Sequence, residues 1–240
     1  MAELLEAGRR RVLDVWMSAD HEDVVELAGR HRVPVRRVGR ARLDAEAHTE
    51  APQGVLAHAE PLPEADADQL CAGGTGLRGP NAEPGPAPFV LAVDGVTDPQ
   101  NLGALLRTAE AAGVTGVLLP RHRAVHVTPA VAKAAAGAIE RLPMAVVAGV
   151  PAALARAREQ GCWTIGLAAD GDQSLFDLSL ATEPVVVVLG AEGAGLSRLV
   201  RQRCDVLVRI PMRGTLPSLN VAAAGALALF EVARRRNRGH

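Results

Sequence analysis

Short apolar runs alternate with segments of helical pattern along residues 89–240. The runs at Phe89–Asp94, 185–189 and 206–210 are apolar almost throughout, as is typical of strands that are buried on both faces. Further strands are predicted at 114–119, Met144–Val147 and 163–168, and helices at 100–112, from Thr128 onward, at 151–160 and at 218–236. This alternation predicts an α/β domain with a mostly parallel sheet.

Capping residues indicate where several of these helices begin and end. Asp98-Pro99 and Thr128-Pro129 each combine an N-cap residue with a first-turn proline. Ser218 is predicted to be the N-cap of the last helix. Gly113 and Gly161 are predicted to end two of the helices.

A segment rich in glycine and proline divides the chain. Residues 72–88 contain five glycines and four prolines, which favour neither a helix nor a central strand. We therefore predict three parts: a small domain over residues 1–71, a linker over 72–88 and a larger domain over 89–240. The first part has strand patterns at 11–17, at 33–38 and, more weakly, at 55–57, with a helix at 21–31 capped by Asp20, so it is predicted to be a small α/β domain.

The composition is that of a folded protein, with 48% hydrophobic and 22% charged residues. The acidic N-terminus lacks the basic start and apolar core of a signal peptide, and no apolar run approaches the roughly 20 residues that cross a bilayer. Cys71, Cys162 and Cys204 lie far apart and lack metal-ligand spacing. These features predict a cytoplasmic protein with no membrane segment, no metal site and no disulfide framework.

Positive charge is concentrated in one stretch of the small domain, although the formal net charge is only −1. The stretch between Ala28 and Asp44 holds six arginines and no acid. Arginine binds phosphate oxygens well, so five of these side chains are predicted to contact RNA: Arg30, Arg32, Arg36, Arg37 and Arg40. A solvated basic face is the alternative interpretation.

Three loops follow predicted strands of the larger domain, and ligands of parallel sheets bind at the carboxyl ends of strands. The first loop leads into a helix that carries Asn101 and Arg107. The second is the glycine-rich segment 189–197, in which Glu192 would repel a phosphate and therefore argues against a nucleotide-phosphate site. The third, 210–220, contains two prolines and a glycine and ends with Ser218 and Asn220. Each loop alone has a simple structural explanation, as a helix cap, a surface charge or a tight turn.

Taken together, the three loops resemble the three sequence motifs of the SpoU/TrmH family of RNA methyltransferases. The motifs are Asn-x-Gly-x-x-x-Arg at 101–107, Gly-x-Glu-Gly-x-Gly at 190–195, and Ile-Pro-Met followed by Ser-Leu-Asn-Val within 210–221. They occur in order over about 130 residues, and the resemblance extends to the small N-terminal domain. It is strongest to the branch that methylates a guanosine ribose of large-subunit rRNA.

The resemblance implies a fold, a cofactor and a set of site residues. The larger domain would be a methyltransferase domain with a C-terminal trefoil knot, the protein would be a homodimer, and the small domain would bind RNA. S-adenosylmethionine would be the methyl donor, held by Leu189, Gly190, Gly193, Gly195, Ile210, Met212 and Leu219. The catalytic residues would be Asn101, Arg107, Glu192, Ser218 and Asn220.

The implied reaction is attack of a ribose 2′-hydroxyl on the methyl group of the cofactor. Arg107 corresponds to the proposed base of the family, but an arginine side chain stays protonated in proteins. We therefore favour an Arg107 that binds the adjacent phosphate and stabilises developing alkoxide charge, while Asn101 and Glu192 position Arg107 and the ribose. Proton acceptance by Arg107 stays open.

Two departures from the family pattern concern the RNA target. Ala222, Ala223 and Ala224 stand where relatives commonly have a serine, so one polar contact is expected to be missing. The N-terminus starts late in the first helix of the family's substrate domain, so a shortened substrate domain is expected. The alternatives are a tRNA ribose methylase, an antibiotic-resistance rRNA methylase, or an RNA-binding protein without catalysis. A dinucleotide-dependent enzyme is disfavoured, because no strand leads into G-x-G-x-x-G.

Overall fold

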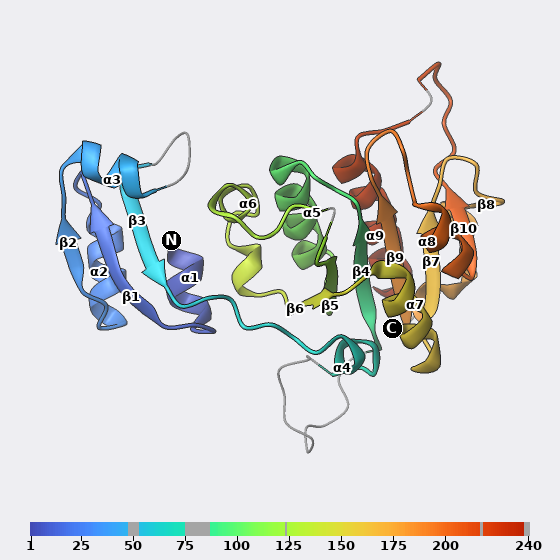
Figure 1. The fold of residues 1–240 in the computed structure, drawn as a ribbon, viewed down its shortest axis with the longest axis horizontal. Coiled ribbons are helices and arrows are strands. Elements are labelled where there is room, and N and C mark those ends of the chain that lie inside the picture. Colours follow the sequence, from blue (N-terminus) through green and yellow to red (C-terminus); the bar gives the residue numbers. More distant parts are fainter. Residues whose placement is uncertain (48–52, 75–86, 123, 217, 238–240) are drawn as a thin grey trace.

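The computed structural model describes residues 1–47, 53–74, 87–122, 124–216 and 218–237. Two sheets lie side by side in it, a three-stranded sheet of order β2-β1-β3 and a seven-stranded sheet of order β6-β5-β4-β9-β7-β10-β8 (Figure 1). Every strand pair of the larger sheet is parallel. The predicted α/β class and the mostly parallel sheet are confirmed.

The small N-terminal sheet is covered by short helices. Its alternating strand residues Val15 and Met17 pack with Val24 of the helix that follows β1. The elements of this part are α1 (Ala2–Ala7), β1 (Val12–Met17), α2 (Glu22–Arg30), β2 (Val35–Arg37), α3 (Arg40–Glu46) and β3 (Val55–Ala59). The helix α4 (Ala67–Cys71) comes next in the chain, and its Leu70 and Cys71 belong to a core of the larger sheet.

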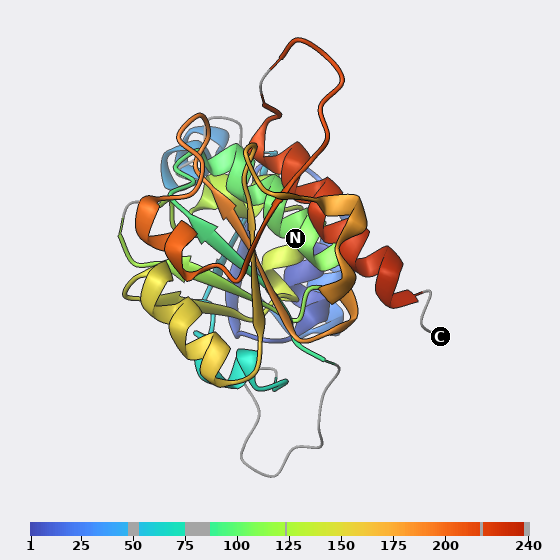
Figure 2. The ribbon, with the colours of Figure 1, turned by 90° about the vertical axis from the view of Figure 1, so that its right-hand side faces the viewer.

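The larger sheet has helices on both faces. Its elements are β4 (Phe89–Asp94), α5 (Pro99–Ala111), β5 (Gly116–Pro120), α6 (Pro129–Ala134), η1 (Ala138–Glu140), β6 (Met144–Val147), α7 (Val150–Glu159), β7 (Trp163–Leu167), β8 (Gln173–Ser174), η2 (Leu175–Asp177), η3 (Ser179–Thr182), β9 (Val185–Gly190), α8 (Arg198–Arg203), β10 (Val206–Arg209) and α9 (Val221–Asn237). In Figure 2, α5 and α9 lie on one side of the sheet, and α7 and α8 on the other.

Alternate residues of the central strands enter two separate cores. Leu91 and Val187 belong to the core that includes Leu105 of α5, whereas Val90 and Val186 belong to the core on the opposite face. Because both faces of β4 and β9 are covered, these strands are apolar at consecutive positions.

Two predicted helix caps are wrong. Asp20 does not cap the first long helix, because α2 starts after His21 and has no side-chain cap. Ser218 does not cap α9 either. That helix starts at Val221, and the side-chain oxygen of Asn220 accepts the backbone N–H groups of Ala222 and Ala223 at 2.8 and 3.3 Å. The caps predicted at Asp98 and Thr128 are confirmed.

Three short α-helices were not predicted from the sequence, namely α3, α4 and α8. The predicted linker begins directly after α4, and its residues 75–86 lie outside the described part of the chain. The proposed domain boundaries and the trefoil knot stay predictions. Within the described residues, no helix combines the length and the apolar character that a membrane crossing requires.

Candidate active site at the carboxyl ends of the sheet

The three loops singled out in the sequence meet at one edge of the larger sheet. Strands β4 and β9 are neighbours, with Asp94 paired to Gly190 at their carboxyl ends. The carboxylate of Asp94 accepts the backbone N–H of Ser197 at 2.7 Å, which connects the first loop to the end of the second. The parallel order of the sheet therefore places segments about 100 residues apart in contact.

The glycine-rich loop folds back on itself directly after β9. Ala191 and Gly195 exchange two backbone hydrogen bonds, at 3.0 and 2.9 Å. A Cβ atom on Gly190 would lie 2.2 Å from the carbonyl carbon of Gly195, so only glycine fits there. Gly193 and Gly195 have φ angles of +72° and +67°, which glycine adopts without strain.

A hydrogen-bonded network joins one residue from each of the three loops. The side-chain amide of Asn101 donates to Glu192 Oε1 at 2.7 Å. The amide of Asn220 donates to the same Oε1 and to Asn101 Oδ1, both at 2.9 Å. Three of the five predicted catalytic residues thus lie in direct contact, and one carboxylate oxygen accepts two amide N–H groups.

Asn220 has a second role, because its Oδ1 atom caps α9 while its Nδ2 atom donates to the network. The start of the last helix is thereby fixed relative to the second loop. Asn101 is 8% exposed and is one of few polar side chains buried among the described residues. Its amide also lies 3.3 Å from Asp98 Oδ2, the cap of α5. The network is therefore supported by the N-termini of two helices.

An apolar cavity of about 180 Å³ lies beside this network. All seven predicted cofactor residues line it: Leu189, Gly190, Gly193, Gly195, Ile210, Met212 and Leu219. Glu192 and Ser218 also contribute to its wall. Sequence reasoning missed six lining residues: Leu167, Ala168, Ala169, Ala191, Val221 and Ala224. Leu167 is the last residue of β7, and Ala168 and Ala169 follow it directly. Their place at the carboxyl end of a parallel strand is the signal in the sequence that could have identified them.

Arg107 lies outside the network. It is on an exposed side of α5, and none of the hydrogen bonds or ion pairs among the described residues involves it. Arg107 and Asn101 are six residues apart, which places them ~120° apart around the axis of a helix with 3.6 residues per turn. The structure brings the two residues onto one helix but not into contact.

Three arginines of the arginine-rich stretch form ion pairs with acidic residues of the small domain. Arg36 pairs with Asp14 at 3.1 Å and Arg37 with Asp20 at 2.6 Å. The third pair is between Arg40 and Asp44, at 3.0 Å. The three arginine side chains are still 65–75% exposed. Arg30 and Arg32 are also exposed.

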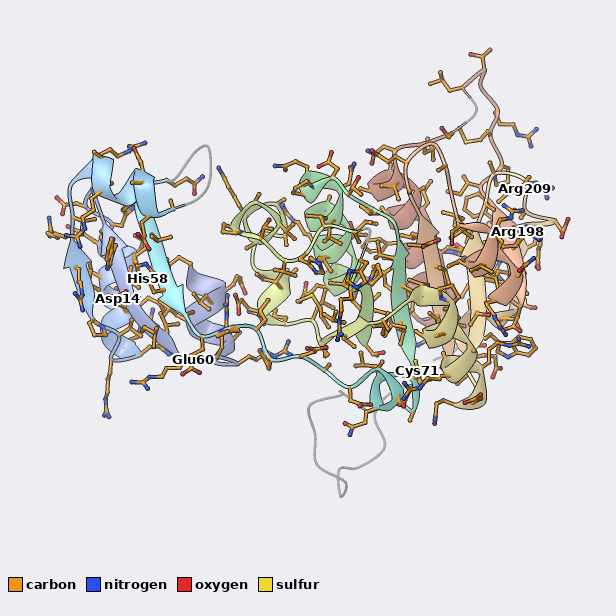
Figure 3. The ribbon with its side chains drawn as sticks, in the orientation of Figure 1. Asp14, His58, Glu60, Cys71, Arg198 and Arg209 are labelled. Atoms are coloured by element: carbon orange, nitrogen blue, oxygen red, sulfur yellow. The ribbon has the colours of Figure 1, made fainter. Side chains whose placement is uncertain are left out.

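Asp14 organises the polar face of the small sheet. It accepts hydrogen bonds from His58 at 2.6 Å and from Trp16 at 3.2 Å (Figure 3). Burial alone would raise the pKa of Asp14, but these two hydrogen bonds and the charge of Arg36 lower it overall. Arg42 lies over the Trp16 ring, 4.9 Å from its centroid. The stretch therefore presents arginines that are held in place by neighbours.

Comparison with known proteins agrees with this geometry. The model of the SpoU rRNA methylase family matches residues 88–230, and the model for RNA 2′-O ribose methyltransferase substrate binding matches residues 2–65. The 23S rRNA (guanosine-2′-O-)-methyltransferase RlmB of Pseudomonas putida is 38% identical over 238 residues, which cover 97% of this chain and 92% of the relative. The putative TrmH family tRNA/rRNA methyltransferase YacO of Bacillus subtilis is 35% identical over 95% of this chain and 90% of its own length.

Solved structures show the same architecture. The SpoU methyltransferase AviRb from Streptomyces viridochromogenes superposes with a TM-score of 0.80 at 28% identity, covering 100% of this chain and 87% of that one. Its complex with the cofactor AdoMet superposes with a TM-score of 0.79 at 26% identity, covering 99% and 88%. The fold, the motif residues and the sequence similarity together place the chain in the SpoU rRNA methylase family.

Proposed function

We propose that this protein transfers a methyl group from S-adenosylmethionine to the ribose 2′-hydroxyl of an RNA nucleotide, a guanosine of 23S rRNA. The single observation that carries the proposal is the Asn101–Glu192–Asn220 network at the rim of an apolar cavity. The network offers polar groups to a substrate, and the cavity offers an apolar wall to a cofactor. The name of the Pseudomonas putida relative supports the rRNA guanosine.

The residues that line the cavity fit the cofactor. Leu189, Ile210 and Leu219 give the apolar contacts that an adenine ring requires, and the glycines Gly190, Gly193 and Gly195 let the backbone form part of the cavity wall. The carboxylate of Glu192 suits a positively charged sulfonium better than a phosphate. The cofactor supplies an activated methyl group, so the protein must mainly position the hydroxyl and assist the loss of its proton.

The network and Arg107 would divide the work on the RNA. Glu192 and Asn101 would orient the ribose, and Ser218 would contact the substrate from the cavity wall. Because Arg107 is exposed and a guanidinium group binds phosphate oxygens well, its role would be to bind the phosphate next to the target ribose and to stabilise the developing alkoxide. Direct proton acceptance by Arg107 is the alternative mechanism.

Calorimetry and a single substitution test the chemistry. Wild-type protein should bind S-adenosylhomocysteine, and NAD should not compete for the site. The Arg107→Ala variant should lose methyl transfer while it keeps its affinity for S-adenosylhomocysteine, because Arg107 does not line the cavity. Wild-type turnover by that variant would remove Arg107 from the mechanism.

RNA contact by the small domain can be tested through its salt dependence. Replacing Arg36, Arg37 and Arg40 together by alanine should weaken RNA binding and reduce the slope of log K against log salt, by roughly 0.7–0.9 for each phosphate that the variant no longer neutralises. Arg30→Ala and Arg32→Ala extend the test to arginines that have no acidic partner among the described residues. An unchanged slope would leave these side chains as a solvated surface.

We propose that the protein is a homodimer and that a second copy covers the outer face of α9. Leu227 and Phe230 are 41% and 49% exposed there, on the face opposite the buried Ala228, Leu229 and Val232. Sedimentation of a Leu227→Arg variant should show monomers. A matched Leu199→Arg change on α8, where the leucine is 62% exposed, should leave the assembly intact. A monomeric wild type would contradict the dimer.

The RNA target distinguishes the main proposal from a second candidate. The name of the Bacillus subtilis relative mentions both tRNA and rRNA, which favours tRNA ribose methylation as the second candidate. Mapping ribose methylation in total RNA with and without the gene should show the loss of one modified guanosine of 23S rRNA. Loss of a tRNA modification instead would establish the second candidate. A ribosomal target also supports a cytoplasmic location, and family membership supports the knot.

A further inference from the structure

One part of the cavity wall that the sequence did not predict is a short loop between β7 and β8. Strand β10 lies between these two strands in the sheet, so residues 168–172 must cross its carboxyl end. Ala168 and Ala169, at the start of this loop, line the cavity. The loop has no helix or strand of its own, so its position depends on the contacts that it makes with β10 and on the ion pair between Asp170, in its middle, and Arg201 of α8 at 2.9 Å.

Arg209, the last residue of β10, contacts the loop through its side chain (Figure 3). Its Nη1 atom donates to the carbonyl oxygens of Gly171 at 2.6 Å and Asp172 at 2.8 Å. Gly171 packs tightly on the backbone of β10, because a Cβ atom there would lie 2.6 Å from the carbonyl carbon of Val208. The backbone N–H of Ala168 donates to Val208 O at 2.9 Å. The loop is therefore held at both ends by the last two residues of β10.

The backbone of Arg209 leads directly into another wall of the same cavity. Ile210 follows it in the chain, and both Ile210 and Met212 line the cavity. A single residue thus connects the loop that carries Ala168 and Ala169 to the segment that carries Ile210. A displacement of the loop from β10 would change the width of the cavity.

We propose that Arg209 is a positioning residue that holds the 168–172 loop in place and so forms the cofactor cavity before the cofactor binds. This inference rests on the proposed function of the cavity. Its physical basis is preorganisation. If the loop is ordered in only a fraction of the molecules, the apparent affinity for the cofactor equals the intrinsic affinity multiplied by that fraction. Arg209 would act through the loop and would not contact the reacting groups.

The Arg209→Ala variant should bind S-adenosylhomocysteine about tenfold more weakly in calorimetry, as expected if the loop is ordered roughly one tenth of the time. Arg209→Lys should recover part of the affinity, because one ammonium group can donate to both carbonyls. In methyl transfer, KM for S-adenosylmethionine should rise while kcat at saturating cofactor stays near the wild-type value. Gly171→Ala, which pushes the loop from β10 without removing a charge, should weaken binding as well.

Arg158→Ala is the matched control. Arg158 pairs with Asp205 at 2.9 Å, just before β10 begins, and it does not line the cavity. The control should bind S-adenosylhomocysteine like wild type. Because Arg209 is exposed, its alanine variant should also unfold at nearly the wild-type temperature without ligand.

Wild-type affinity in Arg209→Ala would overturn the inference. The inference would also be overturned if the Arg158→Ala control lost as much affinity, or if Arg209→Ala unfolded at a clearly lower temperature than wild type. Either result would mean that Arg209 has a merely structural role. A wild-type protein that binds no S-adenosylhomocysteine would instead refute the proposed function of the cavity.

Discussion

Asn220 combines a helix cap and a network donor in one side chain, and the two roles can be separated. Asn220→Asp keeps an oxygen that can cap α9 but replaces the amide donor by a carboxylate next to Glu192. The variant should lose methyl transfer by about 100-fold, the usual effect of misplacing a reacting group. Loss of the cap should contribute nothing to any change in its urea midpoint, because aspartate is as good an N-cap as asparagine.

Thr128→Ala serves as the control for the loss of a cap. The hydroxyl of Thr128 accepts the backbone N–H of Val131 at the start of α6, outside the network. The change should cost about 1 kcal/mol of stability and leave methyl transfer intact. If Asn220→Asp methylated RNA at the wild-type rate, the network would have no part in the reaction.

Glu231 makes the stability of α9 sensitive to acid. It is 6% exposed, and its pKa is lowered from 4.5 to about 2, first by the hydrogen bond from Arg234 and also by that from Arg235, against the effect of burial. A carboxyl group with a lowered folded-state pKa stabilises the fold above its unfolded pKa and loses this contribution as pH falls. The loss should therefore extend from about pH 4.5 down to about pH 2.

Urea unfolding of wild type and Glu231→Gln at several pH values measures this contribution. The wild type should be more stable than the variant at pH 7, and the difference should shrink between pH 4.5 and 2. A difference that does not change with pH would show that the carboxylate of Glu231 is not the group responsible.

At the scale of elements, the glycine-rich loop after β9 should tolerate no side chain at its first position. In Gly190→Ala, the new Cβ would meet backbone atoms of Gly195 and Leu196 at 2.2–2.4 Å, so the loop must move away from the cavity wall. Binding of S-adenosylhomocysteine should fall below detection in calorimetry. In Gly214→Ala nothing lies within 4 Å of the new Cβ, and binding should match wild type. Equal binding by both variants would contradict the role of the loop.

The elements that the sequence predicts best are those that the core buries. Strands β4 and β6 have the predicted bounds, because β4 is apolar on both faces and Met144, Ala145 and Val147 of β6 are buried. Helices α3 and α8 were missed for the opposite reason. Each buries a single side chain, Leu43 or Val200, so neither shows an apolar stripe at helical spacing.

The sequence predicted the site residues that have polar functional groups within the motifs. It did not predict the residues that belong to the site only because the backbone places them there. Asn101, Glu192 and Asn220 stand out as polar residues in loops, and they form one network. Ala168 and Ala169 have no functional group, and they line the cavity only because the loop crosses the end of β10. The contact between Arg209 and that loop depends on the order of strands in the sheet, which no local pattern contains.

At the scale of the whole molecule, a buried ion pair joins the two sheets. Arg10 donates to both carboxylate oxygens of Glu140, at 2.5 and 3.0 Å, and to the backbone oxygen of Glu60 at 2.9 Å. The side chains of Arg10 and Glu140 are only 17% and 5% exposed. A buried pair contributes little net stability, because desolvation offsets the attraction, but it specifies one geometry. We therefore propose that the pair holds the small domain in one orientation relative to the candidate active site.

Removing Arg10 alone and replacing both Arg10 and Glu140 should change the stability of the protein differently. Arg10→Ala leaves the Glu140 carboxylate buried without its partner and should cost about 3 kcal/mol in urea unfolding. The double variant Arg10→Met, Glu140→Leu should recover most of this stability, since apolar groups of similar size can pack in the same place. Its small-angle scattering should nevertheless show a wider range of domain orientations, and its KM for RNA should rise while its affinity for S-adenosylhomocysteine stays unchanged.

The neighbouring pair of Glu3 and Arg141 provides the comparison, because it also joins the two parts but is exposed to solvent. Arg141→Ala should change stability and KM for RNA little, as is usual for exposed pairs. If the double variant methylated RNA with the wild-type KM, the orientation of the small domain would not depend on the buried pair. RNA binding would then have to select the productive orientation by itself, and the ion pair would be a feature of the free protein alone.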